Sequence, residues 1–527
     1  MPAANRVANV QVRTQGFADG LNLQYAPDQL APTEVRRAEN GFLDERGGFT
    51  KRLGCTNVAA IGAAGDRIIS VYTFNRGTLA PQVLIHTSAG RVYYTSDPTA
   101  TPVVFTEIGS GGWSTTQPMS WETFNGKVYF CEGTHTMASW DSATYNANVT
   151  GAPMGKYLRL WKDTMWVAGV ANQPDRVYSS AAGDAETWPV ANWVDIRHGD
   201  GDRILALATD GLYLIVGKRN TGSIITDPAL LDNHTFDYEK GISSHWSVVQ
   251  YESTIYYMTR RGIAEWQGDS PAHLMSYKID PLFDPRVLNF DRLEFAWAYT
   301  YQNRISWCVA EAGSLVPTLQ INYSPRLAML TALGIRGLGP WSTDRVPVAC
   351  AVMWRYQAVQ RLYGGATGAN AFWWVFADNV GADDGNAFTA ILETGSYDFG
   401  APLLTKYIRR LRVLGRGIFN LQVRRNFEGG IIYTSTVDLS IARDQWSLAD
   451  TWNAPGEHWG IEGDVQEATV NPDLYVRYVQ LIFRDINPNP GSMQLPVGQK
   501  DVVLPTGQWS VLACIVDGCA LGIRENH

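Results

Sequence analysis

The stretch Asn125-Gly126-Lys127-Val128-Tyr129-Phe130 joins a tight-turn dipeptide to an apolar, aromatic-rich strand. Asn and Gly accept the left-handed backbone of a hairpin turn, and Val, Tyr and Phe favour a pleated surface. Similar phrases recur along the chain. The first apolar residues of these phrases are Val92, Val128, Met165, Leu212, Ile255 and Ile305, with a weaker seventh at Leu362.

These anchor residues are spaced at the length of a small sheet. Among the first six, successive anchors are between 36 (Val92 to Val128) and 50 (Ile255 to Ile305) residues apart. A period of about 40–50 residues with several short strands per unit is typical of propeller blades. Sheets stacked radially around an axis bury one another's flat faces. We therefore predict an all-β protein with a β-propeller of about seven blades, six to eight being possible.

A second repeat supports the propeller. Arg91-Val92-Tyr93 is followed, after a polar corner, by Phe105-Thr106-Glu107-Ile108. Arg176-Val177-Tyr178 is followed in the same way by Trp193-Val194-Asp195-Ile196. The two copies are 85 residues apart (Arg91 to Arg176), which is close to two blade lengths. The pattern predicts equivalent strands in two different blades.

The chain divides into three predicted parts. Residues 1–60 form an N-terminal interaction or closing segment, in which the charged stretch Pro32–Asn40 predicts a helical turn. Residues 61–385 form the propeller. The small, polar loop 382–386 is the predicted boundary, and residues 386–527 form a C-terminal β-sandwich-like domain.

The C-terminal part shows the alternation of a strand with one wet face. Residues 407–413, 419–423 and 475–483 alternate apolar and polar side chains and are predicted strands. The run 487–491, Asn-Pro-Asn-Pro-Gly, is a predicted loop because proline cannot donate to a sheet ladder.

The composition restricts the functions that are open to the chain. Hydrophobic residues make up 45% and charged residues only 18%, while 50 Gly, 19 Trp and 24 Tyr favour many short strands. The net charge of −8 disfavours tight nucleic-acid binding but suits a wall that DNA slides past. Basic residues occur as doublets, which we interpret as solvated strand edges or interface salt-bridge sites: Arg36-Arg37, Lys51-Arg52, Arg260-Arg261, Arg409-Arg410 and Arg424-Arg425.

Motifs for catalysis are missing from the sequence. It contains no HExxH, no P-loop and no G-x-S-x-G elbow. Cys131 and His135 are predicted to be structural residues, and Asp200-Gly201-Asp202 is predicted to be a turn that leads into a blade. Cys514 and Cys519 are predicted buried thiols without a disulfide. We therefore predict no enzyme and no catalytic, cofactor-binding or metal-binding residues.

The segment Ser179–Trp188 resembles a degenerate Asp-box, the turn of sialidase-like propellers, with Ala181 at the Asp position. An intact box is a folding device, so this likeness supports the propeller and not catalysis. The beginning of the chain, Met1–Ala8, has no apolar run of the kind found in signal peptides, and we expect no direct insertion into a membrane.

The most specific phrase is near the N-terminus. It contains Gly20-Leu21-Asn22-Leu23, Asn40-Gly41-Phe42-Leu43 and the run Gly47–Gly54, Gly-Gly-Phe-Thr-Lys-Arg-Leu-Gly. This phrase resembles the opening of tail proteins of tailed bacteriophages. Leu53 stands where that phrase usually has proline, and Asp19 interrupts its opening glycine pair.

Further matches follow in the same order along roughly the first 410 residues. They are Pro174–Ser180 with Gly183 and Trp188, Gly201–Leu207, Arg260–Trp266, and Gly395–Gly400 with Lys406. The resemblance implies a propeller-type tail hub or nozzle that works as a structural part and not as an enzyme.

The resemblance also implies partners and a location. Such proteins form a homohexameric tube below the portal and adaptor rings, carry tail fibres or spikes, and pass genomic DNA through the centre without binding it specifically. The implied location is the virion tail, after assembly in the host cytoplasm. A baseplate or fibre-anchoring protein, a carbohydrate-binding or glycoside-cleaving propeller, and a monomeric binding scaffold remain alternatives.

Overall fold

The computed structural model describes residues 8–13, 16–44, 47–268, 271–330, 340–426, 430–439, 466–485 and 509–521. Strands dominate these residues, and the few helices are short. The chain forms two compact units. The propeller unit comprises Cys55–Asn322 and Arg345–Val375, and the sheet unit comprises Met1–Gly54, Tyr323–Asp344 and Phe376–His527.

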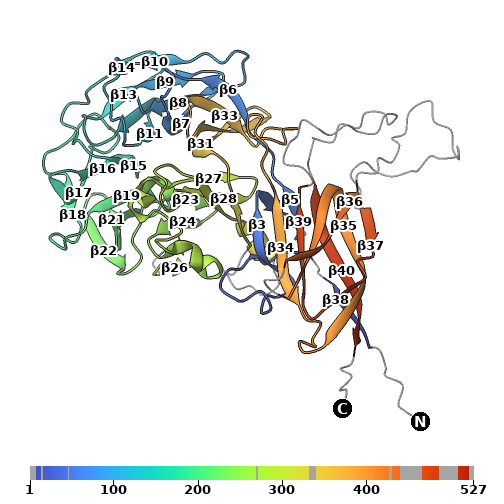
Figure 1. Ribbon diagram of the computed structural model, residues 1–527. Coiled ribbons are helices and arrows are strands. Elements are labelled where there is room, and N and C mark those ends of the chain that lie inside the picture. Colours follow the sequence, from blue (N-terminus) through green and yellow to red (C-terminus); the bar gives the residue numbers. More distant parts are fainter. Residues whose placement is uncertain are drawn as a thin grey trace, which may run out of the picture. The chain divides into compact units, whose positions relative to one another are not determined.

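Six complete blades, each a four-stranded antiparallel sheet, make up most of the described propeller unit (Figure 1). The first strands of neighbouring blades contact one another around most of the ring. The first three blades are β7 (Ile68–Arg76), β8 (Leu79–Thr87), β9 (Val92–Thr95) and β10 (Thr106–Ile108); β11 (Ser120–Phe124), β12 (Lys127–Cys131), β13 (Ala138–Trp140) and β14 (Tyr145–Asn146); and β15 (Tyr157–Trp161), β16 (Thr164–Val170), β17 (Gln173–Ser179) and β18 (Trp193–Asp195).

The last blade closes the ring with a strand from the other end of the sequence. Its strand β6 (Thr56–Ala60) pairs with β33, so residues more than 300 positions apart share one sheet. The remaining blades are β19 (Ile204–Thr209), β20 (Leu214–Lys218), β21 (Gly222–Asp227) and β22 (Asp232–Asp237); β23 (Val249–Tyr251), β24 (Thr254–Thr259), β25 (Gly262–Trp266) and β26 (His273–Leu274); and β31 (Val348–Tyr356), β32 (Val359–Ala366), β33 (Ala371–Val375) and β6.

A hairpin fills the sector of the ring between β23 and β31. It consists of β27 (Trp297–Tyr301) and β28 (Arg304–Val309), which β29 (Leu319–Tyr323) follows. The Trp297 indole donates to the Ala351 carbonyl of β31 at 2.9 Å. Six complete blades and this hairpin agree with the predicted propeller of six to eight blades.

The turn phrases that predicted the blades occupy the hairpin between the first and second strands in most copies. Asn125 and Gly126 have φ angles of 48° and 75°, as a tight hairpin turn requires. Val92 is an exception because it begins β9, the third strand of its blade, and the turn before it has the same chemistry. Leu212 lies outside the strand and is exposed, two residues before β20 begins at Leu214.

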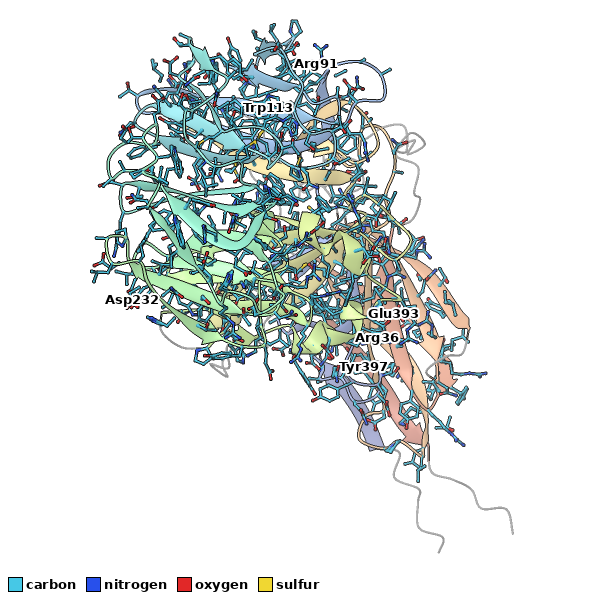
Figure 2. All side chains as sticks on the ribbon, turned by 90° about the vertical axis from the view of Figure 1, so that its left-hand side faces the viewer. Arg36, Arg91, Trp113, Asp232, Glu393 and Tyr397 are labelled. Atoms are coloured by element: carbon cyan, nitrogen blue, oxygen red, sulfur yellow. The ribbon has the colours of Figure 1, made fainter. Side chains whose placement is uncertain are left out.

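The second repeat is confirmed. Its two copies are the third and fourth strands of the first and third blades, β9–β10 and β17–β18. An equivalent ion pair joins the two strands of each copy. Arg91, labelled in Figure 2, contacts Glu107 at 2.7 Å, and Arg176 contacts Asp195 at 2.7 Å. The matching sequences therefore reflect a repeated cross-strand contact.

The sheet unit is a large mixed sheet organised around the long strand β35 (Thr405–Arg425). Its first half pairs with β40 (Ser510–Leu521), β37 (Gln466–Val470) and β38 (Leu474–Val476). Its second half pairs with β36 (Ile431–Leu439) and β39 (Val479–Arg484). The other strands are β1 (Ala8–Arg13), β2 (Gly20–Leu21), β3 (Glu34–Glu39), β4 (Gly41–Leu43), β5 (Phe49–Lys51), β30 (Trp341–Asp344) and β34 (Ile391–Tyr397), and α1 is Pro325–Leu330.

Both halves of β35 bury their apolar side chains in one core. Ile408 and Val413 from the first half and Phe419 and Val423 from the second belong to the same buried cluster. This agrees with the predicted sandwich-like second domain. The predicted strands 407–413 and 419–423 are one continuous strand, whereas the predicted strand 475–483 divides into β38 and β39.

Three boundary predictions differ from the structure. The prediction of a helical turn over Pro32–Asn40 is wrong. Glu34–Glu39 form strand β3, and Val35 and Ala38 are fully buried where β3 pairs with β34. Residues 16–54 belong to the sheet unit and do not form a separate segment. The loop 382–386 also lies inside that unit, since Asp383 is buried in it. The predicted loop 487–491 lies outside the described residues.

Candidate functional site

The propeller axis is closed by its own chain. The single turn η1 (His245–Ser247) contacts β19, β24 and the hairpin strand β27. His245 Nε2 lies 3.0 Å from the Ser120 hydroxyl, and the Trp246 indole donates to the Met119 carbonyl at 3.2 Å. Trp246 also stacks on Trp297, with ring centroids 6.4 Å apart. Because these contacts reach blades that are not neighbours, the turn lies across the centre of the ring.

His245 and Ser120 have the residue types of a catalytic pair but the wrong hydrogen bonding. The Leu207 amide donates to His245 Nδ1 at 3.3 Å, so a neutral ring carries its proton on Nε2 and donates it to Ser120. Burial, and then the nearby Arg159, lowers the pKa of His245 to about 3. His245 therefore cannot remove the Ser120 proton, and the pair holds the turn in place.

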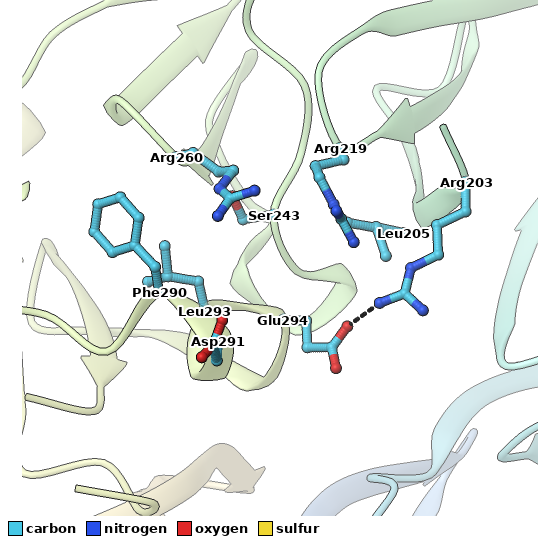
Figure 3. A pocket seen from close by; sticks show the side chains of 9 residues that line it. All are labelled: Arg203, Leu205, Arg219, Ser243, Arg260, Phe290, Asp291, Leu293 and Glu294. Carbon is cyan, nitrogen blue, oxygen red and sulfur yellow. Dashed lines mark hydrogen bonds and ion pairs between the residues drawn. The ribbon is translucent and has the colours of Figure 1, made fainter. Parts of the chain in front are cut away.

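The candidate site is a cavity of about 200 Å³ beside this turn (Figure 3). Arg203 precedes β19, and Arg219 and Arg260 lie in the turns after β20 and β24. Segments that lead into a first strand and turns that join the second strand to the third lie at the same end of a blade. The three arginines therefore share one face of the propeller. We call the site the arginine pocket; its lining is Arg203, Leu205, Arg219, Ser243, Arg260, Phe290, Asp291, Leu293 and Glu294.

The three guanidinium groups of the pocket differ in their partners. Arg203 pairs with Glu294 at 2.5 Å. Arg260 lies 5.8 Å from the centre of the Phe290 ring. Within the described part of the chain, neither Arg219 nor Arg260 makes a hydrogen bond or an ion pair through its side chain. Two cations in the pocket are thus available to a ligand.

Ser243 is the buried polar group of the pocket. It is 3% exposed, and its hydroxyl has no hydrogen-bond partner among the described residues. A buried hydroxyl without a partner costs about 1–3 kcal/mol. Such a group in the wall of a cavity is a natural contact for a bound polar molecule.

A buried charge cluster holds the chain segments next to Arg203 and Arg219. Lys218 is fully buried, and its ammonium group contacts Asp175 and Asp200, each at 2.8 Å. On the other side of Arg219, the Asn220 amide donates to Asp202 at 2.8 Å. Burial alone would raise the pKa of Asp200, but its hydrogen bond from Lys218 helps to hold that pKa below its usual value.

Asp200-Gly201-Asp202 lies between β18 and β19, where the sequence predicted a turn into a blade. The Ser179–Trp188 segment joins β17 to β18 and is held by local bonds, such as the Trp188 indole to the Ala185 carbonyl at 2.9 Å. Both segments therefore have structural roles in the propeller.

The doublet Lys51-Arg52 is not solvated, which corrects its interpretation as a strand edge. Arg52 is fully buried and donates to both oxygens of Asp383, at 2.9 and 2.6 Å. Its Nε donates to the Asn40 side chain at 3.2 Å, and its guanidinium lies 3.5 Å from the Phe388 ring centre. We call this group, Asn40, Arg52, Asp383 and Phe388, the arginine lock.

Other residues of the phage-tail-like phrases also hold the sheet unit together. A side chain at Gly20 would clash with the backbone of Trp341, and one at Gly54 with the Ala382 carbonyl. The Asn22 amide donates to Glu34 at 2.9 Å. Lys406 is fully buried and donates to the Arg477 carbonyl at 2.7 Å, and burial lowers the pKa of Lys406.

The other basic doublets occupy varied positions. Arg261 pairs with Glu239 at 3.0 Å on the surface, and Arg37 pairs with Glu39 at 2.8 Å. Arg424 pairs with Glu393, which is labelled in Figure 2. Arg409 and Arg410 are exposed on β35.

Cys131 and His135 have different surroundings and do not form a metal site with each other. Cys131 is buried on β12, and burial raises the pKa of its thiol, while His135 contacts Glu132. Among the described residues, no three His, Cys, Asp or Glu side chains are grouped as metal ligands. Cys514 is buried, and the side chain of Cys519 lies outside the described part.

Comparisons with solved structures found likenesses at low sequence identity. No family model and no curated protein matches the sequence. The designed protein Ika8 aligns with 61% of this chain and 99% of its own, at 8% identity and a TM-score of 0.35. YCF48 from Cyanidioschyzon merolae aligns with 61% of this chain and 98% of its own, at 9% identity and a TM-score of 0.38.

Raptor from Chaetomium thermophilum aligns over 62% of this chain and 30% of its own, at 12% identity and a TM-score of 0.40. These likenesses concern the fold alone. In the described residues, no helix has the length and the apolar character needed to span a bilayer.

Sequence reasoning missed the arginine pocket. Of its residues, Arg203 and Leu205 belong to the phrase Gly201–Leu207 and Arg260 to the doublet Arg260-Arg261, but neither feature pointed to a pocket. Arg219 and Ser243 carry no local signal, because their proximity depends on the packing of two blades.

Proposed function

We propose that the protein is a structural component of a bacteriophage tail, a hub or nozzle subunit that assembles with copies of itself into a ring or tube. In this role it would continue the DNA conduit and anchor fibres or spikes. The phage-tail-like phrases suggest the role, and the arginine lock supports it, because the residues of those phrases serve to build the sheet unit.

The observation that carries the proposal is a set of exposed aliphatic side chains at one end of the propeller blades. Six large aliphatic side chains are exposed in or next to turns that join first to second or third to fourth strands, all at the end of the blades opposite the arginine pocket. These six residues, which we call the apolar face, are Leu79, Val104, Val190, Leu212, Leu230 and Val359. Leu212 is 68% exposed and Leu230 is 77% exposed. Exposed apolar side chains gathered on one side favour contact with another protein surface.

The experiment measures assembly of the full chain by mass photometry and negative-stain imaging. We expect rings or tubes for the wild type, and a shift towards monomers for Leu212→Asp and Leu230→Asp. Leu315→Asp is the matched control, since Leu315 is 70% exposed in a turn between second and third strands, at the other face.

A wild-type protein that stays monomeric, both alone and with adaptor rings, would contradict the proposal. Equal loss of assembly in Leu315→Asp would contradict the role of the apolar face. Immunogold labelling of virions at the tail would then test the location directly.

A carbohydrate-binding propeller is the second candidate, and the arginine pocket favours it. Glycoside cleavage needs two suitably placed carboxyl groups. Of the two in the pocket, Glu294 is already paired with Arg203, so the pocket favours binding over cleavage.

A further inference from the structure

The arginine pocket combines charges in a way that selects a ligand. It contains three arginines and the carboxylates of Asp291 and Glu294. The Arg203–Glu294 pair satisfies one charge of each sign. Arg219 and Arg260 remain for an anionic group, and Asp291 remains as an acceptor for hydroxyl donors. A ligand that carries both an anion and hydroxyl groups would satisfy all of them.

The size of the pocket suits a ligand with a single small ring. Its volume of about 200 Å³ is below the ~300–1,000 Å³ that is usual for drug-sized ligands. Phe290 and Leu293 lie together on one side of the pocket, and Leu205 lies on the side of Arg219 and Arg203 (Figure 3). The C–H face of a sugar ring packs on apolar side chains such as Phe290 and Leu293 while its hydroxyl groups meet the polar side chains.

Ser243 points to the same class of ligand. Its buried hydroxyl lacks a partner in the described chain and lines the cavity with the arginines. A carboxylate or a hydroxyl group of a ligand would satisfy this hydroxyl. A bare inorganic anion would leave Asp291 without a donor and beside a like charge, which is unfavourable.

We propose that the arginine pocket binds one acidic monosaccharide unit, with the ligand carboxylate between Arg219 and Arg260, its hydroxyl groups at Asp291 and Ser243, and its ring on Phe290. The Arg203–Glu294 pair is a fixed part of the wall, and the Lys218 cluster holds Arg219 in position. This site is independent of the tail role, because its residues are not part of the apolar face.

The test is titration calorimetry of the full chain with D-glucuronate and with N-acetylneuraminate. D-Glucose and N-acetyl-D-mannosamine are the neutral counterparts, and inorganic phosphate is the bare anion. We expect saturable binding of at least one acid sugar and none of its neutral counterpart. Loss of one charged hydrogen-bonding partner should weaken binding on the order of 10- to 100-fold in Arg219→Gln and in Arg260→Gln.

Arg261→Gln is the matched control, because Arg261 is the sequence neighbour of Arg260 but pairs with Glu239 on the surface. Its affinity should stay within about twofold of wild type, while Ser243→Ala should bind more weakly than wild type. Circular dichroism would verify that each variant is folded.

Three results would overturn the proposal: no saturable binding of either acid sugar, equal affinity for the neutral sugars, or equal loss in Arg261→Gln. Phosphate binding as tight as that of the acid sugar would overturn the saccharide assignment, since the ring would then contribute nothing. Ring assembly is measured separately, so failure of this site and failure of the tail proposal are distinguishable.

Discussion

At the scale of single residues, buried charged side chains need complete hydrogen bonding. Arg52 is fully buried, and Asp383, with its Asn40 and Phe388 neighbours, neutralises and packs it. The desolvation of such a pair is costly, so its hydrogen bonds must be complete. Here the guanidinium has partners for Nε and for both terminal nitrogens.

The first prediction concerns this lock. Asp383→Asn leaves the Arg52 charge without a counterion in the interior. We expect it to lower the free energy of unfolding by about 3–5 kcal/mol, as measured by urea denaturation with tryptophan fluorescence. The control is Arg37→Gln, which breaks a surface pair and should cost about 0–1 kcal/mol. A similar small cost for Asp383→Asn would show that the lock contributes little.

The second prediction concerns pH. His86 is fully buried in β8, and burial lowers its pKa from 6.5 to about 4, against the opposing pull of Glu132. Between these two values the unfolded chain binds a proton at His86 that the folded chain does not. Stability is therefore fully present above pH 6.5 and falls as the pH drops towards 4, by up to about 1.4 kcal/mol per pH unit.

His86→Leu should remove this contribution. We expect its unfolding free energy to depend less steeply on pH than that of wild type between pH 6.5 and 4, in urea titrations at several pH values. His135→Leu is the control, because that side chain is about half exposed. Parallel pH profiles for wild type and His86→Leu would contradict the prediction.

At the scale of secondary-structure elements, tight turns determine how the strands of a blade pair. Each blade depends on hairpins whose turn residues adopt positive φ angles, as Asn125 and Gly126 do between β11 and β12. These residues set the register, and a one-residue slip would move every buried side chain of the strand to the other face. The same holds in β35, where buried and less buried side chains alternate from Leu411 to Val423 after a register shift at Ile408/Arg410.

The third prediction isolates the effect of turn conformation. A side chain added at Gly126 would have no atom within 4 Å, so Gly126→Ala introduces only the strain of φ +75°. We expect a loss of about 1–2 kcal/mol in unfolding free energy. Gly368→Ala is the control, because Gly368 has equal space but no positive φ. Equal effects in the two variants would rule out backbone strain as the cause.

At the scale of the whole molecule, the propeller depends on closure of the ring of blades. The last blade is complete only when β6 pairs with β33, and no neighbouring sequence provides that strand. Closed rings hide the sheet edges that would otherwise pair with other chains. The closure also brings Trp297 against β31 and lets η1 fill the axis.

The fourth prediction tests this closure. Proline at both Asn57 and Ala59 removes two backbone donors from β6, whose partners in β33 are Trp373 and Phe372. We expect a melting temperature lower by several degrees, and aggregation through the exposed edge, in thermal scans with light scattering.

Its control is Ala64→Pro. Ala64 is the second residue of the turn that the Asp66 amide closes onto the Ala63 carbonyl, and proline is favoured at that position. A normal melting temperature for the double-proline variant would show that the ring does not need β6.

The propeller and its repeats could be predicted from local sequence. Hairpin turns and strand alternation depend on neighbouring residues such as Asn125-Gly126 and Arg91-Val92-Tyr93, and the spacing of these phrases gives the length of a blade. The closing strand, the burial of Arg52 and the arginine pocket came only from the assembled fold. Arg203, Arg219, Ser243 and Arg260 lie on different strands and turns, and they meet because blades pack side by side around an axis. A residue's environment in such a ring depends on which blade faces it, and no short stretch of chain carries that information.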